Sequence, residues 1–268
     1  MRLVARCHNN CRSTSKTGPA KVRGMATPTV SHSKPWLPYV APMAVYMVFL
    51  LAQSNANLVW LYPIKVLAVA GVLWWFRKQY VELQPGGAGL AMPRAWLAVG
   101  IGLVAIAVWI AGDPYYPKVE ELMFRCESWL SPLLHSPPPK VAAGPVFDPT
   151  LIQPVAIRLA FLVARVAGAV LVVPVMEELF WRAFLIRWVD QEDFQAVPVG
   201  VFSWRAFAIT VALFGAEHNQ WLAGLICGAL YNWLLRRTRS LPACILAHAV
   251  SNAALAVWVL ARGDWKFW

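Results

Sequence analysis

Seven long apolar stretches, separated by short polar segments, dominate the chain after residue 35. They cover residues 36–51, 58–76, 95–111, 154–188, 202–217, 221–235 and 242–260. Stretches of this length and composition are typical of helices that cross or enter a bilayer. We therefore expect an all-α protein, a polytopic transmembrane helical bundle of about seven to eight spanning helices.

The fourth stretch stands apart through its length and its charges. Its roughly 35 residues would measure about 50 Å as a helix, which is too long for one straight crossing, and splitting it would give the eighth span. Pro174 predicts a kink within it. Arg158 and Arg165 are seven residues apart and so share a face, which predicts that this part is interfacial or lines a wet cavity.

The composition agrees with a membrane protein. Of the 268 residues, 59% are hydrophobic and 14% are charged, against about 25% charged in an ordinary soluble domain. The net charge of +11 would suggest nucleic acid in a soluble protein, but its distribution here indicates membrane orientation, so we expect no nucleic-acid partner. The five cysteines are scattered and predict no disulfide framework.

The basic residues also predict domain organisation and orientation. Residues 1–35 contain seven Lys or Arg and no acid, which indicates a disordered cytoplasmic tail, and residues 36–268 are expected to form a single bundle. Seven spans that start in the cytoplasm place the basic segments 77–94, 187–204 and 236–239 on the cytoplasmic side. The proline-rich loop 112–153 and the C-terminus are then outside.

Two adjacent carboxylates interrupt the fourth apolar stretch. Glu178 lies four residues before Arg182, so the two side chains share a helix face and can pair. Glu177 points about 100° away and has no local cation. Carboxylates are costly in a lipid-embedded helix and usually have a function there, although a helix end among the headgroups is the alternative.

Three further polar residues lie in the late apolar stretches. His218 ends the fifth stretch, and His248 and Asn252 share one face of the seventh because they are four residues apart. A single buried histidine is more often a core residue than a catalyst. Together with the glutamates, however, these groups can converge in a bundle core, where polar residues face one another rather than lipid.

Such a set suits the hydrolysis of a peptide bond. A carboxylate and a histidine can hold and deprotonate a water, and a second histidine with an asparagine can donate to the oxyanion. Ser251 is close to His248 in sequence, but this spacing does not ensure an activated Ser–His pair. Water is therefore the expected nucleophile.

The motifs Glu-Glu-x-x-x-Arg, Phe-x-x-x-His and His-x-x-x-Asn, in this order on late helices, resemble those of the CPBP family. This family comprises type II CAAX prenyl endopeptidases and bacteriocin-processing intramembrane proteases. The resemblance covers a protease-like core at about residues 151–260, and the chain is also similar to the CAAX-protease-like proteins of bacterial exosortase systems. The resemblance to the CPBP family implies that Glu177 and His218 activate the water and that His248 and Asn252 form the oxyanion site. It also implies that Glu178 and Arg182 support these residues.

The resemblance implies a metal-free glutamate-type intramembrane endopeptidase in a bacterial inner membrane. Its substrate would be a membrane-anchored peptide or protein such as a prenylated CAAX tail, a leader peptide or a sorting-signal stub. Two alternatives stay open: a zinc metalloprotease that uses Glu177, His218 and His248 as a His₂Glu site, and a non-enzymatic binding or immunity protein. For the groups to meet, the chain must turn at about residues 218–221 inside the bilayer.

Overall fold

The computed structural model describes residues 34–84, 95–137 and 146–268, and residues 35–268 form one compact unit. All regular secondary structure in these ranges is helical, which confirms the predicted all-α class. Except for its last two residues, the predicted basic tail at 1–35 lies outside the described residues. The longer helices are α1 (Leu37–Ala52), α2 (Leu58–Phe76), α3 (Ala95–Gly112), α4 (Val119–Leu130), α5 (Val155–Ala167), α8 (Trp204–Ala216), α9 (Trp221–Thr238) and α10 (Leu241–Arg262).

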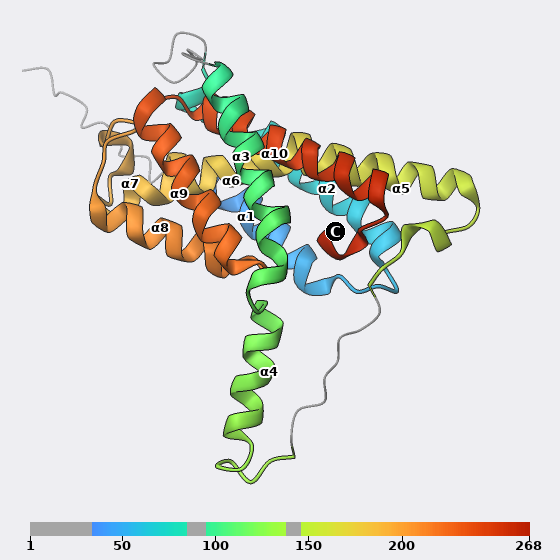
Figure 1. Ribbon diagram of the computed structural model, residues 1–268. Helices are drawn as coiled ribbons and strands as arrows, with labels where there is room; N and C mark the ends of the chain where they lie inside the picture. The colour runs from blue at the N-terminus through green and yellow to red at the C-terminus, as the bar shows by residue number, and fades with distance from the viewer. Residues whose placement is uncertain (1–33, 85–94, 138–145) are drawn as a thin grey trace, which may run out of the picture. The chain divides into compact units, whose positions relative to one another are not determined.

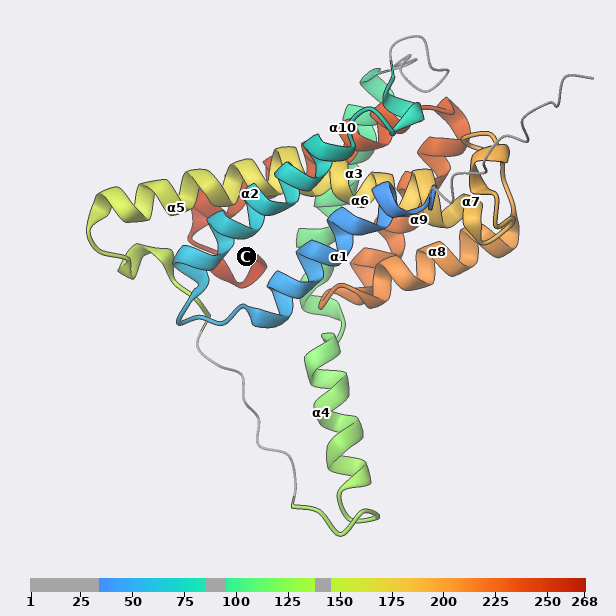
Figure 2. The ribbon, with the colours of Figure 1, turned by 180° about the vertical axis from the view of Figure 1, so that it is seen from behind.

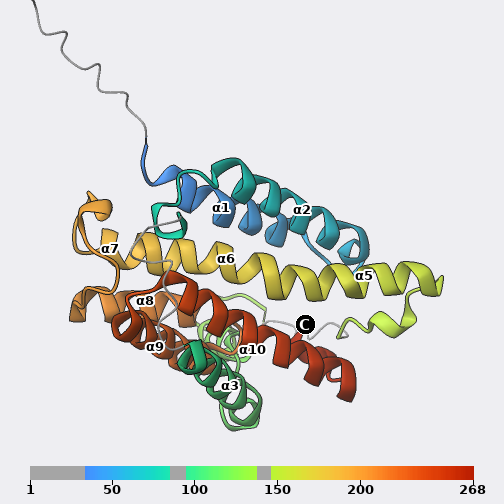
Figure 3. The same cartoon turned by 90° about the horizontal axis from the view of Figure 1, so that it is seen from above.

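A long helical rod divides the bundle. It runs from α5 through α6 (Val173–Glu178) to α7 (Ile186–Trp188), with α1 and α2 on one side and α3, α8, α9 and α10 on the other (Figure 3). Helix α3 crosses α10 closely at Gly102, where a β-carbon would meet the Ala247 carbonyl and lie 2.9 Å from Val250 Cβ. The rod therefore touches both groups of helices, and its side chains face the centre of the bundle.

Within the described residues, four helical segments are long and apolar enough to cross a membrane. They are Leu58–Phe76, Ala95–Leu130, Val155–Trp188 and Leu241–Arg262, and Leu37–Ala52 and Trp204–Ala216 are shorter apolar helices. The polytopic bundle is thus confirmed, whereas the predicted number of seven to eight spans is not.

The predicted loop at 112–153 contains helix α4, so that prediction was wrong in part. Helix α4 has acidic residues in its first turn, an exposed Glu121–Arg125 pair one turn apart and no buried residue. It projects away from the other helices (Figures 1 and 2). The prolines and charges of this region indicated a loop, but the charge spacing in α4 stabilises a helix.

Pro174 does not kink the rod as predicted. A π-helical turn, η4 (Gly168–Val172), directly precedes Pro174, and the Val173 amide donates to the Gly168 carbonyl five residues earlier. Figure 3 shows the rod continuing without a break from α5 into α6. Pro174 has no N–H to donate to the preceding turn, and the wider turn accommodates this loss. The helix therefore continues through a residue that would otherwise bend it.

The segments predicted to be cytoplasmic meet at one end of the bundle. Arg187 at the end of the rod forms a buried ion pair with Glu82, which follows α2. The Tyr39 hydroxyl of α1 donates to the same carboxylate at 2.8 Å. Gly200 lies against Arg239 at the end of α9, where a β-carbon would be 3.0 Å from Arg239 Cγ. These contacts fit a common side for the three basic segments, while the orientation in the membrane stays a prediction.

Helix α3 also anchors the last turn of the chain. Lys266 of η7 (Trp265–Phe267) donates to Asp113 Oδ2 at 2.9 Å, and Lys118 lies 3.0 Å from the other carboxylate oxygen. The hydrogen bond to Asp113 raises the pKa of Lys266, so this lysine is cationic over the whole physiological range. The anchor holds Phe267 and Trp268 at the cavity described next.

Candidate active site

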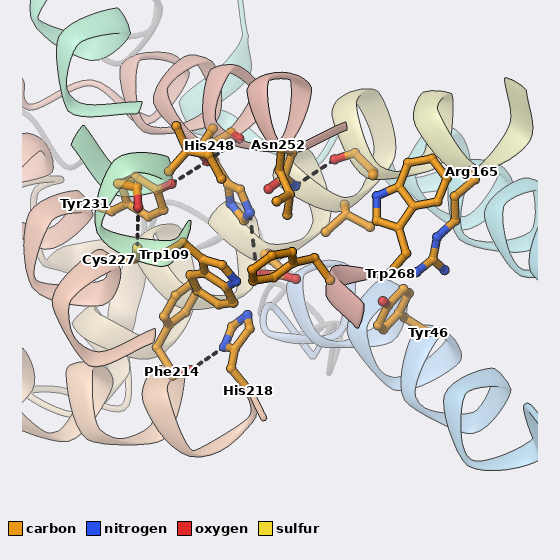
Figure 4. Close-up of a pocket in the computed structure, with 18 of the residues that line it drawn as sticks. Tyr46, Trp109, Arg165, Phe214, His218, Cys227, Tyr231, His248, Asn252 and Trp268 are labelled. Atoms are coloured by element: carbon orange, nitrogen blue, oxygen red, sulfur yellow. Dashed lines mark hydrogen bonds and ion pairs between the residues drawn. The ribbon is translucent and has the colours of Figure 1, made fainter. Parts of the chain in front are cut away.

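A cavity of about 240 Å³ lies between the rod and helices α2, α3, α8, α9 and α10. Glu177, His218, His248 and Asn252, the four residues predicted to be catalytic, all line it. They come from α6, from the turn after α8, and from α10, so the cavity brings together groups that are up to 75 residues apart in sequence. Figure 4 shows the His248 side chain reaching down from α10 and the His218 side chain reaching up from the turn after α8, so that the two rings point toward each other.

The two glutamates have different surroundings. Glu178 is fully buried and forms an ion pair with Arg182 at 3.1 Å, as the spacing predicted, and its Oε1 also accepts from His248 Nδ1 at 2.9 Å. Glu177 faces the cavity, and its Oε2 is buried without a hydrogen-bond partner, 3.9 Å from His248 Nε2. Each glutamate keeps one oxygen without a hydrogen-bond partner, but only Glu177 lines the cavity, so only its carboxylate can reach something bound there.

The contacts of His218 fix its tautomer. Its Nδ1 lies 2.7 Å from the Phe214 carbonyl, and a carbonyl only accepts, so Nδ1 carries the hydrogen. In the neutral ring Nε2 is then the acceptor. The rings of Phe214 and Trp109 pack against the imidazole with centroids at 4.8 and 5.2 Å. His218 is thus held in place with its basic nitrogen available.

Helix α10 contributes a second histidine and two hydrogen-bonding side chains. The His248 ring stacks on Tyr231 at 5.4 Å, and its Nδ1–H donates to Glu178. One N–H of the Asn252 amide donates to the Ala169 carbonyl at 2.8 Å, and the amide has a second N–H. Ser251 Oγ donates to the His248 carbonyl and accepts from the Tyr231 hydroxyl. Ser251 is therefore held by groups other than a histidine ring, which agrees with water as the expected nucleophile.

Glu217 adds a third carboxylate that we did not assign from the sequence. One ligand atom each of Glu177, Glu217 and His218 lie within 4.8 Å of one another, and Glu217 Oε1 accepts from Trp181 Nε1 at 3.1 Å. Two carboxylates and a histidine fit a catalytic zinc ion, which takes three protein ligands and leaves one position for water. The sequence alternative named His248 as the third ligand, and the structure binds His248 Nδ1 to Glu178 and places its Nε2 3.9 Å from Glu177 Oε2.

One face of the rod forms a wall of the cavity. Arg165, Ala169, Val173 and Glu177 all line it at intervals of four residues. In an ordinary α-helix this spacing would drift around the axis, but the wider π-helical turn η4 lies within this interval and reduces the drift. The cavity wall therefore extends for three turns, from a cation at one end to a carboxylate at the other.

Residues 159–254 match a family model described as Type II CAAX prenyl endopeptidase Rce1-like. This segment belongs to the CPBP family. It begins within α5 and ends within α10, so it contains the rod, the turn at His218 and the His248–Asn252 face. Searches of curated proteins and of solved structures gave no significant match.

The match of this segment supports a CAAX-type intramembrane protease, and with the apolar helices it indicates an integral membrane protein with a peptide substrate. Part of the cavity lies outside this segment, because α1, α2 and α3 supply Tyr46, Tyr62 and Trp109, and Trp268 follows η7. Sequence reasoning did not find these aromatic residues, since nothing in their spacing distinguishes a cavity wall from other apolar helix faces.

Proposed function

We propose that the cavity hydrolyses a peptide bond of a membrane-associated substrate with a water held between Glu177 and His218. The observation that carries this proposal is the interval between a Glu177 oxygen and a His218 ring nitrogen, at most 4.8 Å. A water that forms hydrogen bonds of about 2.8 Å to both groups bridges about 4.5 Å. Glu177 Oε2 has no other hydrogen-bond partner, and the tautomer of His218 leaves its Nε2 as an acceptor. Both groups can therefore accept a hydrogen bond from this water.

The water is deprotonated as it attacks the substrate carbonyl. Glu177 accepts the proton, and His218 Nε2 accepts a hydrogen bond from the second O–H and orients the lone pair of the water. The new C–O bond converts the carbonyl into a tetrahedral oxyanion. When the C–N bond breaks, the proton on Glu177 passes to the leaving nitrogen, so the carboxylate is regenerated.

His248 and Asn252 stabilise the oxyanion. The second amide N–H of Asn252 donates to it, because the first is bound to Ala169. His248 donates from Nε2 while its Nδ1–H remains on Glu178, which requires the doubly protonated ring. Glu178, which Arg182 holds in position, is the acidic partner of that ring.

The test is cleavage of a farnesylated peptide that ends in a C-a-a-X sequence by purified protein in proteoliposomes, followed by mass spectrometry. Glu177→Gln should lower the rate at least about 10²–10⁴-fold in a protein that still folds, because it removes the general base. Glu127→Gln, an exposed position on α4, is the matched control and should cleave at the wild-type rate. A folded Glu177→Gln protein with near-normal cleavage would refute the assignment.

The zinc alternative is tested in the same assay, since Glu177, Glu217 and His218 offer a set of possible ligands. Bound zinc would lower the pKa of a coordinated water, with Glu177, Glu217 and His218 as ligands. The metal-free proposal expects activity to survive exhaustive chelation, and Glu217→Gln to retain most of it. Activity lost on chelation, restored by zinc and lost equally in Glu217→Gln would establish the metalloprotease instead.

If no membrane peptide is cleaved by the wild type and none accumulates in Glu177→Gln membranes, the non-enzymatic alternative holds. The proposed location is a bacterial inner membrane with the N-terminus in the cytoplasm. This rests on the basic segments that meet at one end of the bundle.

A further inference from the structure

The cavity has two chemically different ends. The carboxylates and histidines described above form one end. At the other end Arg165 lies beside Trp268, with its guanidinium carbon 5.7 Å from the Trp268 ring and 4.5 Å from the Tyr62 ring (Figure 4). A second cation, Lys65, lies behind the Tyr46 and Tyr62 rings at 4.5 and 4.7 Å.

The two cations have neutral partners only. Lys65 is 1% exposed, and its ammonium group donates to Gln53 Oε1 at 2.9 Å. The contacts of Arg165 are with aromatic rings, and the two cations are close enough to repel each other electrostatically. Among the described residues, no aspartate or glutamate forms an ion pair with either of them. Lys65 is buried and Arg165 is half-buried, and a cation without a counter-ion in such surroundings is costly, so a bound anion would offset that cost.

We infer that Arg165, with Lys65 behind it, binds the C-terminal carboxylate of the peptide whose scissile bond lies at Glu177 and His218. This inference rests on the proposed function and adds to it a recognition site for the end of the substrate. The guanidinium of Arg165 lines the cavity directly and can donate two parallel hydrogen bonds to a carboxylate. The Lys65 ammonium group lies behind the Tyr46 and Tyr62 rings, and its positive charge attracts the carboxylate across these rings without direct contact.

The distance along the rod fits a short peptide. Twelve residues separate Arg165 from Glu177, which is about 18 Å along a helix, and an extended chain covers about 3.3–3.6 Å per residue. Three to five residues therefore fit between the cleaved bond and the carboxylate, allowing for the length of the arginine side chain. The small side chains of Ala169 and Val173 leave room for this peptide along the rod.

The experiment compares two farnesylated C-a-a-X peptides that differ only in a free C-terminal carboxylate or a C-terminal amide. Wild-type protein should cleave the acid with a kcat/KM about tenfold to hundredfold above that of the amide, as expected for a hydrogen bond to a charged group. Arg165→Gln should remove this preference by slowing the acid and leaving the amide rate nearly unchanged. Arg165→Lys should restore part of it, because it keeps the charge but not the paired donors.

Arg158→Gln is the matched control. Arg158 lies on the same helix seven residues earlier and donates to the Thr150 carbonyl outside the cavity, so its loss should not alter the acid-to-amide ratio. Equal cleavage of both peptides by the wild type, or an equal loss for both in Arg165→Gln, would overturn the inference.

Binding to Glu177→Gln protein separates this inference from the proposed function. Binding is followed by the anisotropy of a fluorescently labelled peptide, because the 15 tryptophans of the chain would obscure a signal from Trp268 alone. The peptide with a free carboxylate should bind to the Glu177→Gln protein more tightly than the amide peptide does. In the double variant that also contains Arg165→Gln, the two peptides should bind equally tightly. If both peptides bind alike while phosphatidylglycerol micelles bind only when Arg165 is intact, the site takes a lipid phosphate and the inference is wrong.

Discussion

Glu177 and Glu178 show at the residue scale how adjacent identical side chains acquire different tasks. The helix separates them by about 100°, so one meets Arg182 on its own helix and the other reaches the cavity. Arg182 is itself covered by the rings of Phe214 and Tyr231. The pair is therefore shielded from solvent, and removing one partner leaves a charge without compensation.

We predict that Arg182→Ala lowers stability far more than the same change in an exposed pair. Arg182 and Glu178 are 1% and 0% exposed, and breaking a buried pair of this kind costs about 3–5 kcal/mol. Arg125→Ala removes a pair with the same spacing on α4 and should cost only about 0.3–0.5 kcal/mol. Thermal unfolding of both proteins in detergent measures the difference. Similar unfolding temperatures for the two variants would contradict the structural role of Arg182.

The spacing rule for helices made the Glu178–Arg182 pair predictable, and motif order made the four cavity residues predictable. The hydrogen bond from Trp181 to Glu217 was not, because it joins two elements whose packing no local rule describes. The same holds for Lys65, which is an isolated charge in sequence and becomes part of a cation pair only when α2 packs against α5.

At the scale of elements, apolar runs and caps located most helices to within a few residues. Helix α10 begins where Ser240 accepts from the Ala243 amide and ends at Gly263 with φ 66°. The π-helical turn η4 was not predictable from the sequence, because a proline within an apolar stretch, such as Pro174, indicates a kink. What decides for a wider turn is the close packing of Gly168 against α2.

Gly168 therefore offers a test of the packing of the rod. A β-carbon there would lie 2.5 Å from Val66 Cγ2 and 2.9 Å from the Tyr62 hydroxyl, so Gly168→Ala should destabilise the protein by about 1–3 kcal/mol. It should also disturb the Tyr62 ring that supports Arg165. Gly71→Ala on α2 is the control, because nothing lies within 4 Å of its β-carbon and alanine should stabilise that helix by about 0.5–1 kcal/mol. Equal unfolding temperatures for the two variants would refute the tight contact.

At the scale of the whole molecule, the sequence predicted the helical membrane bundle, while its number of seven to eight crossings stays a prediction. Helix α8 has 13 residues and is shorter than a bilayer requires, yet its short length is what allows the turn at His218 to line the cavity. Hydropathy alone does not distinguish a short helix that ends at a site from one that crosses the membrane.

The orientation is tested with single cysteines and a maleimide that does not cross membranes. In a background without the five native cysteines, Arg237→Cys at the basic end should react only after the cytoplasmic side is opened. Restored Cys126, exposed on α4, should react in intact cells. These expectations follow from the excess of positive charge in cytoplasmic segments. Labelling of both positions from one side would contradict the predicted topology.

The face of the rod from Arg165 to Glu177 also acts as a ruler. A helix keeps a fixed rise per residue and does not stretch, so three turns between a carboxylate receptor and a hydrolytic centre define one span of substrate. A peptide of another length would place its amide groups past the water or short of it. Under the proposed function and the inferred carboxylate site, the number of residues released would be set by a count of helical turns rather than by a preference for particular side chains.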